Sequence, residues 1–281
     1  GNPQSGMPSI QVAGTNGKGS VCAMLSNIFK IAGYKTGLFT SPHLINVNER
    51  IRINGLPISN EEIDIFIKKY KIDIERIETT FFETITAMAF WYFKKEGVDI
   101  AVLETGLGGR LDSVSICEPM ATIITPISLD HLEILGETLP QIAFEKAGVL
   151  KKGVICISAQ QESSATEVLI EEANKKESPI QFINSDNYSE FKLNIQGKSQ
   201  QENAWLTVSS LSLLKDFDIS DEAIINGLKS VKWYGRNQII QKNPFVIFDV
   251  AHNLAGMKSF LEHYKDLNIT GDSALVISLQ A

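Results

Sequence analysis

The chain has 281 residues, 43% of them apolar and 21% charged, which is enough to bury one large core or two ordinary ones. Its 26 basic and 33 acidic residues give a net charge of −7, whereas nucleic-acid-binding proteins usually carry a net positive field. No apolar run approaches the length of a bilayer span, the first ten residues lack a signal-peptide layout, and three scattered cysteines exclude a disulfide framework. We therefore expect a cytoplasmic protein with no membrane or nucleic-acid partner.

Short apolar runs alternate with segments of helical periodicity along the chain. The predicted strands occupy residues 10–13, 36–39, 100–103, 122–125, 154–158, 180–183, 245–248 and 275–278. The predicted helices occupy residues 19–32, 82–95, 139–150, 165–175, 202–215, 221–230 and 254–266. Because the apolar runs are continuous rather than alternating, we expect an α/β fold whose mostly parallel sheet carries helices on both faces.

The first predicted strand leads into a glycine-rich loop and the start of a helix. The sequence of this loop is Gly14-Thr15-Asn16-Gly17-Lys18-Gly19-Ser20. Glycines let backbone N–H groups turn toward phosphate oxygens, the helix N-terminus adds its positive end, and the lysine adds a point charge. The strict P-loop pattern needs Gly at position 12 and Ser or Thr at position 19, where this chain has Val12 and Gly19. The sequence therefore predicts a variant phosphate-binding loop.

Acidic residues follow three later strands. Glu104 ends one strand, the pair Asp130-His131 follows the next, and Asp249 ends another, three residues before His252. In an open α/β sheet, ligands bind beyond the carboxyl ends of the strands, where a carboxylate can hold the Mg²⁺ that accompanies a nucleotide. The alternatives are an ion pair with a lysine for Glu104 and a purely structural role for the histidines. By composition alone, Lys146 is a solvated surface lysine.

Taken together, these motifs resemble the folylpolyglutamate synthase/dihydrofolate synthase family, a branch of the Mur-type ATP-dependent amide ligases. The resemblance rests on the glycine-rich loop and on the following blocks, in this order: Thr40-Ser41-Pro42-His43, Asn48-Glu49-Arg50, Phe81-Phe82-Glu83, Glu104-Thr105-Gly106, Leu111-Asp112, Asp130-His131, Glu145-Lys146-Ala147-Gly148, Gly235-Arg236 and Ala251-His252-Asn253. After Leu111-Asp112 the family usually runs Ala-Thr-Asn, whereas this chain has Ser113-Val114-Ser115.

The resemblance implies a set of site residues. For the ATP phosphates it implies Thr15, Asn16, Gly17, Lys18, Gly19 and Ser20, and for the rest of the nucleotide Asn203, Arg236, Asp249 and His252. For Mg²⁺ it implies Ser41, Glu104 and His131, with a second Mg²⁺ on Lys146, which the family carbamylates and which is therefore not expected at the surface. For a pterin ring it implies Thr80, Phe81, Phe82, Glu83, Leu111, Asp112 and Ser113. Lys18, His131 and Lys146 are the implied catalytic residues.

The implied reaction is ATP-dependent amide formation. The γ-phosphoryl group passes to the carboxylate of dihydropteroate, of a reduced folate such as tetrahydrofolate, or of both, and L-glutamate attacks the acyl phosphate. A monomer is expected. The alternatives are another Mur-type amino-acid ligase, a non-ligase P-loop protein such as a kinase, and a nucleotide-binding fragment without turnover.

Two domains are expected. The prediction is a P-loop domain over residues 1–234 and the beginning of a smaller Rossmann-like α/β domain over residues 235–281, divided near residues 233–237. About 45 residues are too few for a core of their own, so we expect a partial chain in which the second domain is incomplete.

Overall fold

The structure is a computed structural model that describes residues 1–184 and 190–278. The elements in chain order are β1 (Ser9–Ala13), α1 (Lys18–Ile31), β2 (Thr36–Phe39), β3 (Ile51–Ile53), β4 (Leu56–Pro57), α2 (Asn60–Ile77), α3 (Phe81–Glu96), β5 (Ile100–Glu104), β6 (Ala121–Ile124), α4 (Leu132–Leu135), α5 (Leu139–Lys146), β7 (Ile155–Ala159), α6 (Ser163–Lys175), β8 (Ile180–Ile183), α7 (Lys198–Leu211), α8 (Asp221–Ser230), β9 (Gln238–Lys242), β10 (Phe245–Phe248) and α9 (Leu254–Asp266).

The described residues form an eight-stranded sheet in the order β4-β3-β2-β5-β1-β6-β7-β8. The strands from β2 to β8 in this order pair in parallel, while β3 and β4 add an antiparallel edge. This confirms the predicted α/β fold with a mostly parallel sheet. Because β1 lies between β5 and β6, the carboxyl ends of these three strands meet at the centre of one sheet edge.

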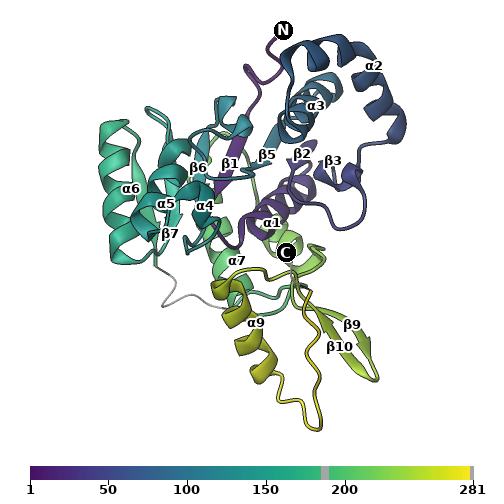
Figure 1. Cartoon of the computed structure of the whole chain (residues 1–281), viewed down its shortest axis with the longest axis vertical. Coiled ribbons are helices and arrows are strands. Elements are labelled where there is room, and N and C mark those ends of the chain that lie inside the picture. The colour runs from purple at the N-terminus through teal and green to yellow at the C-terminus, as the bar shows by residue number, and fades with distance from the viewer. Residues whose placement is uncertain (185–189, 279–281) are drawn as a thin grey trace.

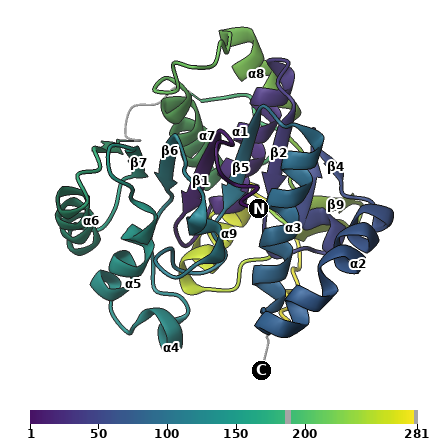
Figure 2. The same ribbon diagram turned by 90° about the horizontal axis from the view of Figure 1, so that it is seen from above.

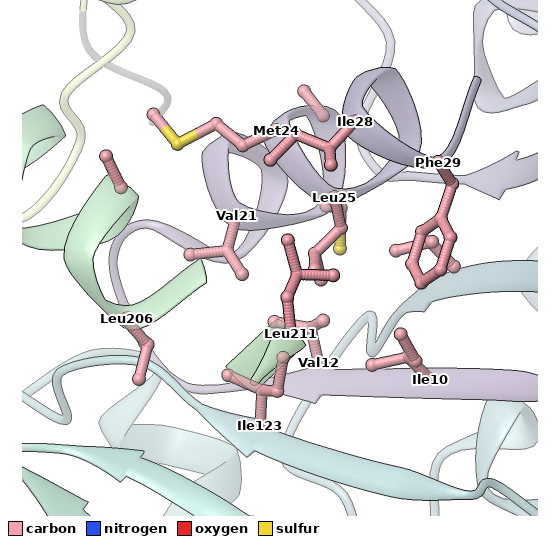
Figure 3. Packing of buried hydrophobic residues seen from close by; sticks show 14 of the residues in the cluster. Ile10, Val12, Val21, Met24, Leu25, Ile28, Phe29, Ile123, Leu206 and Leu211 are labelled. Atoms are coloured by element: carbon pink, nitrogen blue, oxygen red, sulfur yellow. The ribbon is translucent and has the colours of Figure 1, made fainter. Parts of the chain in front are cut away.

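Helices cover both faces of the sheet, with α1, α7 and α8 on one face and α3, α5 and α6 on the other (Figures 1 and 2). On β1, the side chains of Ile10 and Val12 point to the first face, where they pack with Leu25 of α1 and Leu206 of α7 (Figure 3). Burying an aliphatic side chain of this size contributes about 1.5–3 kcal/mol. This packing fixes the position at which α1 leaves β1, and with it the loop between them.

Five observed elements are absent from the sequence prediction: β3, β4, α2, α4 and β9. The strands β3 and β4 are only three and two residues long, and helix α2 has Phe66 as its one buried side chain, among many charged residues. Helix α4 has only four residues, and β9 has only Ile239 and Ile240 as apolar residues. Runs this short give a weak periodic signal, and the prediction misses β3, β4, α4 and β9 for that reason. In α2, by contrast, Ile63, Phe66 and Tyr70 recur at helical spacing and pack on the core, so the sequence carries a signal that the prediction overlooks.

One predicted strand is wrong. Residues 275–278 adopt no regular structure, and the side chains of Leu275, Val276 and Ile277 are exposed. A strand requires a hydrogen-bonded neighbour, and the described part of the chain offers these residues none. The apolar run alone is therefore not sufficient for a strand here.

After α8 the chain leaves the large sheet. Strands β9 and β10 form a separate antiparallel pair, and α9 follows them near α7 (Figure 1). The predicted domain division at residue 234 falls just before this pair and stays a prediction. Within the described ranges, no helix combines the length and the apolar character that a bilayer crossing requires.

Candidate nucleotide site

The loop between β1 and α1 is held open by two glycines. Gly14 and Gly17 have φ angles of 135° and 93°, which non-glycine residues rarely adopt. A Cβ atom at Gly14 would overlap the hydroxyl of Thr125, and one at Gly17 would overlap the carboxamide of Asn203. No described side chain caps the start of α1, so its first backbone N–H groups are available to an anion.

The departure from the strict P-loop pattern at Gly19 has a steric explanation. A Cβ atom at this position would lie 3.0 Å from the indole ring of Trp233, which packs on the first turn of α1. The guanidinium of Arg52 lies over the same ring, 5.4 Å from its centroid. The indole therefore occupies the space that a larger side chain at position 19 would need. The hydroxyl of the next residue, Ser20, is buried without a hydrogen-bond partner among the described residues.

Two lysines converge on the glycine-rich loop. Lys18 Nζ donates to the carbonyl oxygens of Gly14 and Thr15 at 3.1 and 3.0 Å, and Lys146 Nζ donates to that of Gly14 at 2.7 Å. Lys146 is only 3% exposed, so the interpretation of this residue as a surface lysine, made from composition alone, is wrong. Burial, reinforced by the charge of Lys18, lowers the pKa of Lys146 to about 7. A substantial fraction of this amine is therefore neutral near pH 7.

A buried carboxylate lies at the end of β5. Glu104 is 4% exposed, and its Oε2 accepts a hydrogen bond from the backbone N of Ser41 at 2.9 Å. Burial raises the pKa of Glu104, while the positive charge of Lys18 and this hydrogen bond oppose the rise. A cation placed here would relieve the cost of burying the charge.

The loop after β6 brings a second carboxylate to the same edge. Asp130 Oδ1 accepts from the backbone N of His131 at 3.0 Å, and Asp130 Oδ2 accepts from Asn253 Nδ2 at 2.9 Å. The Nε2 atoms of His131 and His252 lie 4.0 and 3.7 Å from this carboxylate. His131 also has a φ of 49°, unusual for a residue other than glycine. Asp130 thus lies between two imidazoles from distant parts of the chain.

The remaining predicted nucleotide residues come from α7 and from the segment after α8. Asn203, on α7, is buried against Gly17 of the loop. Asp249 accepts from the backbone N atoms of Asn237 and Ala251 at 2.7 and 2.8 Å, and Arg236 donates to the carbonyl of Gly235. His252 is exposed, and its Nδ1 lies 3.0 Å from the carbonyl of Val250, which can only accept.

One cavity of about 570 Å³ brings most of these residues together. The predicted residues that line it are Thr15, Asn16, Gly17, Lys18, Gly19, Ser41, Glu104, His131, Lys146, Asn203, Arg236, Asp249 and His252. Every residue predicted for nucleotide or metal except Ser20 is therefore in its wall. The cavity lies between the large sheet and the segment that carries α9.

None of the residues predicted for the pterin lines this cavity. Thr80 and Glu83 cap α3, since Glu83 Oε2 accepts from the backbone N of Thr80 at 2.7 Å and Thr80 Oγ1 accepts from that of Glu83 at 3.2 Å. Asp112 accepts from the backbone N atoms of Leu107 and Val114, which fixes its loop. These contacts give Thr80, Glu83 and Asp112 structural roles that the sequence prediction does not include.

The other four residues predicted for the pterin are Phe81, Phe82, Leu111 and Ser113. Phe82 packs against Gly106, at the back of the cavity wall, and the hydroxyl of Ser113 is 2.8 Å from that of Thr86 on α3. Phe81 is 60% exposed, and the Leu111 side chain is also exposed. The seven residues thus lie outside the cavity, with Phe82 behind its wall at Gly106.

Two residues that shape the site have no role in the sequence prediction: Asn253, next to His252, and Trp233. For Asp130 the prediction gives only a place at the ligand-binding edge of the sheet, beside His131. The signal for Asp130 and Asn253 is their position within the Asp130-His131 and His252-Asn253 pairs. For Trp233 the sequence offers no signal, because its contact with Gly19 spans most of the chain.

Comparison with known proteins identifies the family. The family model of the Mur ligase middle domain matches residues 12–214. The dihydrofolate synthase/folylpolyglutamate synthase of Bacillus subtilis is 36% identical over an alignment 297 residues long. The alignment covers 94% of this chain and 69% of that protein.

Two solved structures extend the similarity to the fold. A complex of FPGS (folylpolyglutamate synthase) with AMPPCP and folate is 28% identical with a TM-score of 0.89, covering 95% of this chain and 73% of that one. Mycobacterium tuberculosis folylpolyglutamate synthase, in complexes with ADP and AMPPCP, is 30% identical with a TM-score of 0.87, covering 94% and 67%. The chain therefore belongs to the folylpolyglutamate synthase/dihydrofolate synthase family of Mur-type ligases.

Proposed function

We propose that this protein is an ATP-dependent ligase that adds L-glutamate to the carboxylate of dihydropteroate, a reduced folate or both. The observation that carries the proposal is the cavity in which the uncapped N-terminus of α1, the two lysines and the buried Glu104 meet. Family membership gives the reaction class, an acid–amino-acid ligase. The assignment of roles to individual residues is the proposal.

The reaction has two steps. First, a carboxylate oxygen of the folate substrate attacks the γ-phosphorus of ATP; the new O–P bond replaces the bond to the β-phosphate oxygen, and ADP leaves. Second, the glutamate amine attacks the acyl carbon, the new C–N bond replaces the C–O bond to phosphate, and the amine gives up a proton. Both steps move negative charge on phosphoryl oxygens, so positioned cations and N–H donors lower their barriers.

Lys18 and the start of α1 are proposed to bind the ATP phosphates. Lys18 Nζ donates to the loop carbonyls of Gly14 and Thr15, and a phosphate oxygen can take over as its acceptor. The backbone N–H groups at the start of α1, from Lys18 to Ser20, point from a helix N-terminus, which favours negative charge. Asn203, Arg236, Asp249 and His252, in the facing wall, are proposed to hold the ribose and base.

The donors near Glu104 fit Mg²⁺. Within the described residues, no group of three or more His, Cys, Asp or Glu side chains could hold a metal. Mg²⁺ typically needs only one or two carboxylates, because it also binds substrate phosphates and water. The buried Glu104 carboxylate supplies the charge, and Ser41 and His131 are proposed to complete the protein's share. Bound there, Mg²⁺ would neutralise charge on the phosphates.

Lys146 is proposed to carry a carbamate. Carbon dioxide adds to a neutral amine, and burial keeps the pKa of Lys146 at about 7, so the reactive form is present at neutral pH. A carbamate would convert this cation into an oxygen ligand for a second Mg²⁺.

The pterin is proposed to bind outside the Gly106 loop. The exposed rings and side chains of Phe81 and Leu111 offer an apolar surface there, and Phe82, Thr80, Glu83, Asp112 and Ser113 support it. Arg50 lies over the Phe81 ring, 5.3 Å from its centroid, at the edge of this surface.

Replacing Lys18 tests its proposed role in binding the ATP phosphates. Lys18→Ala removes the point charge at the phosphates, so glutamate-dependent ADP release should fall by at least about a hundredfold. The matched control is Lys30→Ala, because Lys30 is exposed at the other end of the same helix. Circular dichroism establishes that both variants fold. Turnover of Lys18→Ala close to that of the unmodified protein would overturn the assignment.

A further inference from the structure

Asn253 begins helix α9. Its Oδ1 accepts a hydrogen bond from the backbone N of Gly256 at 2.9 Å, which caps the helix. Serine, threonine or aspartate could make the same bond, so the cap alone does not require asparagine at this position.

The same carboxamide pairs with the phosphate-binding loop. Asn16 Nδ2 donates to Asn253 Oδ1, and Asn253 Nδ2 donates to Asn16 Oδ1, both at 3.1 Å. The second N–H of Asn253 Nδ2 reaches Asp130 Oδ2 at 2.9 Å. A carboxamide has two donor hydrogens and two acceptor lone pairs, and at Asn253 all four are used.

The partners of Asn253 are themselves tied into the site. Asn16 also donates to Ser128 Oγ at 3.3 Å, and Asp130 accepts from the backbone N of His131. Asn253 therefore joins the glycine-rich loop, the loop after β6 and the start of α9, segments up to 237 residues apart in sequence. Asp249 and His252, on the far wall of the cavity, immediately precede it.

We propose that Asn253 is a positioning residue that holds the two walls of the nucleotide cavity together. It rests on the proposed function, because it takes the cavity as the ATP site. Asn253 does not line the cavity; it acts through Asn16 and Asp130, which do. Losing these bonds frees α9, with Asp249 and His252, to move away from the loop, so ATP binds more weakly.

Substitution by serine separates this role from the cap. Asn253→Ser keeps an oxygen that can accept from Gly256 but has no amide to bond Asn16 and Asp130. We expect the KM for ATP to rise about tenfold, a change that corresponds to the net free energy of one to two hydrogen bonds. The melting temperature should change little. Asn253→Ala, which also loses the cap, should show the same KM and a lower melting temperature. The control is Asn174→Ala, an exposed asparagine on α6.

A double-mutant cycle supplies the second test. If Asn16 and Asn253 act as a pair, Asn16→Ala combined with Asn253→Ser raises the KM for ATP by less than the product of the two single effects, because the bonds between the two residues are lost only once. An unchanged KM in Asn253→Ser, or a double variant whose effect is the product of the single effects, overturns the proposal. Either result leaves the proposed function standing as long as the unmodified protein releases ADP only when glutamate is present. ADP release from the unmodified protein that does not depend on glutamate would contradict the proposed function instead.

Discussion

An ammonium group buried as deeply as Lys146 is stable only where its charge is compensated or its proton is lost. Its ammonium donates to the neutral carbonyl of Gly14, and the neighbouring Lys18 disfavours the charge further. Burial therefore lowers the pKa to about 7, from 10.5 in an exposed lysine. The loss of stability caused by burying Lys146 depends on pH, because between these two pKa values the unfolded chain binds the proton more tightly than the folded chain.

This predicts a pH-dependent stability difference between the protein and Lys146→Met. Between pH 7 and 10.5 the unfolded state holds more protons, so the stability of the unmodified protein rises with pH, by up to about 1.4 kcal/mol per unit. The variant lacks this contribution. Urea unfolding is measured at pH 7.5 and 9.5, in carbonate-free buffer that prevents carbamylation. The free energy of unfolding should rise more between these pH values for the unmodified protein than for the variant.

The control is Lys94→Met, at an exposed lysine of α3, which should follow the unmodified protein at both pH values. Equal pH dependence for Lys146→Met and the unmodified protein would show that Lys146 does not titrate as a buried amine.

At the scale of elements, the contact of α1 with α8 fixes the helix that follows the glycine-rich loop. A Cβ atom at Gly227 of α8 would lie 2.6 Å from Ile28 Cγ1 and 2.8 Å from Ile28 Cα. Asn27 Nδ2 also donates to the carbonyl of Gly227 at 2.7 Å. The two helices approach this closely only because residue 227 has no side chain.

Gly227→Ala should therefore destabilise the protein. Alanine favours the helix by roughly 1 kcal/mol, but overpacking against backbone atoms typically costs about 1–3 kcal/mol, so we expect a net loss of about 1–2 kcal/mol. Chemical denaturation measures it. Asn226→Ala, one residue earlier and exposed, is the matched control and should stay within about 0.5 kcal/mol of the unmodified protein. A Gly227→Ala variant as stable as the unmodified protein would mean that α8 can move aside.

The elements that could be predicted are those whose own residues carry the signal. One example is the strand ending at Ala13, which is followed within a few residues by the two loop glycines and the apolar face of α1. Each of these features can be recognised from the local sequence. Helix α2 also carries a periodic pattern, with Ile63, Phe66 and Tyr70 on one face, which the sequence prediction overlooks. Residues 275–278 form an apolar run, but among the described residues no neighbouring strand pairs with it, so it forms no strand.

At the scale of the molecule, the parallel sheet explains why separate motifs meet. Strands β1, β5 and β6 end side by side, so Lys18, Glu104 and His131 reach one cavity, and their positions after strands made this predictable. The bonds of Asn253 to Asn16 and Asp130 were not predictable, since they depend on how α9 docks.

The measurement that tests the account most directly is ADP release with its substrates supplied one at a time. With ATP and Mg²⁺ present, the account predicts ADP only when both L-glutamate and dihydropteroate or tetrahydrofolate are added, with one amide formed per ADP. A UDP-muramyl acid in place of the folate should give none. ADP release that is the same without glutamate would contradict the account, because the cavity would then serve a kinase or an ATPase rather than a glutamate ligase.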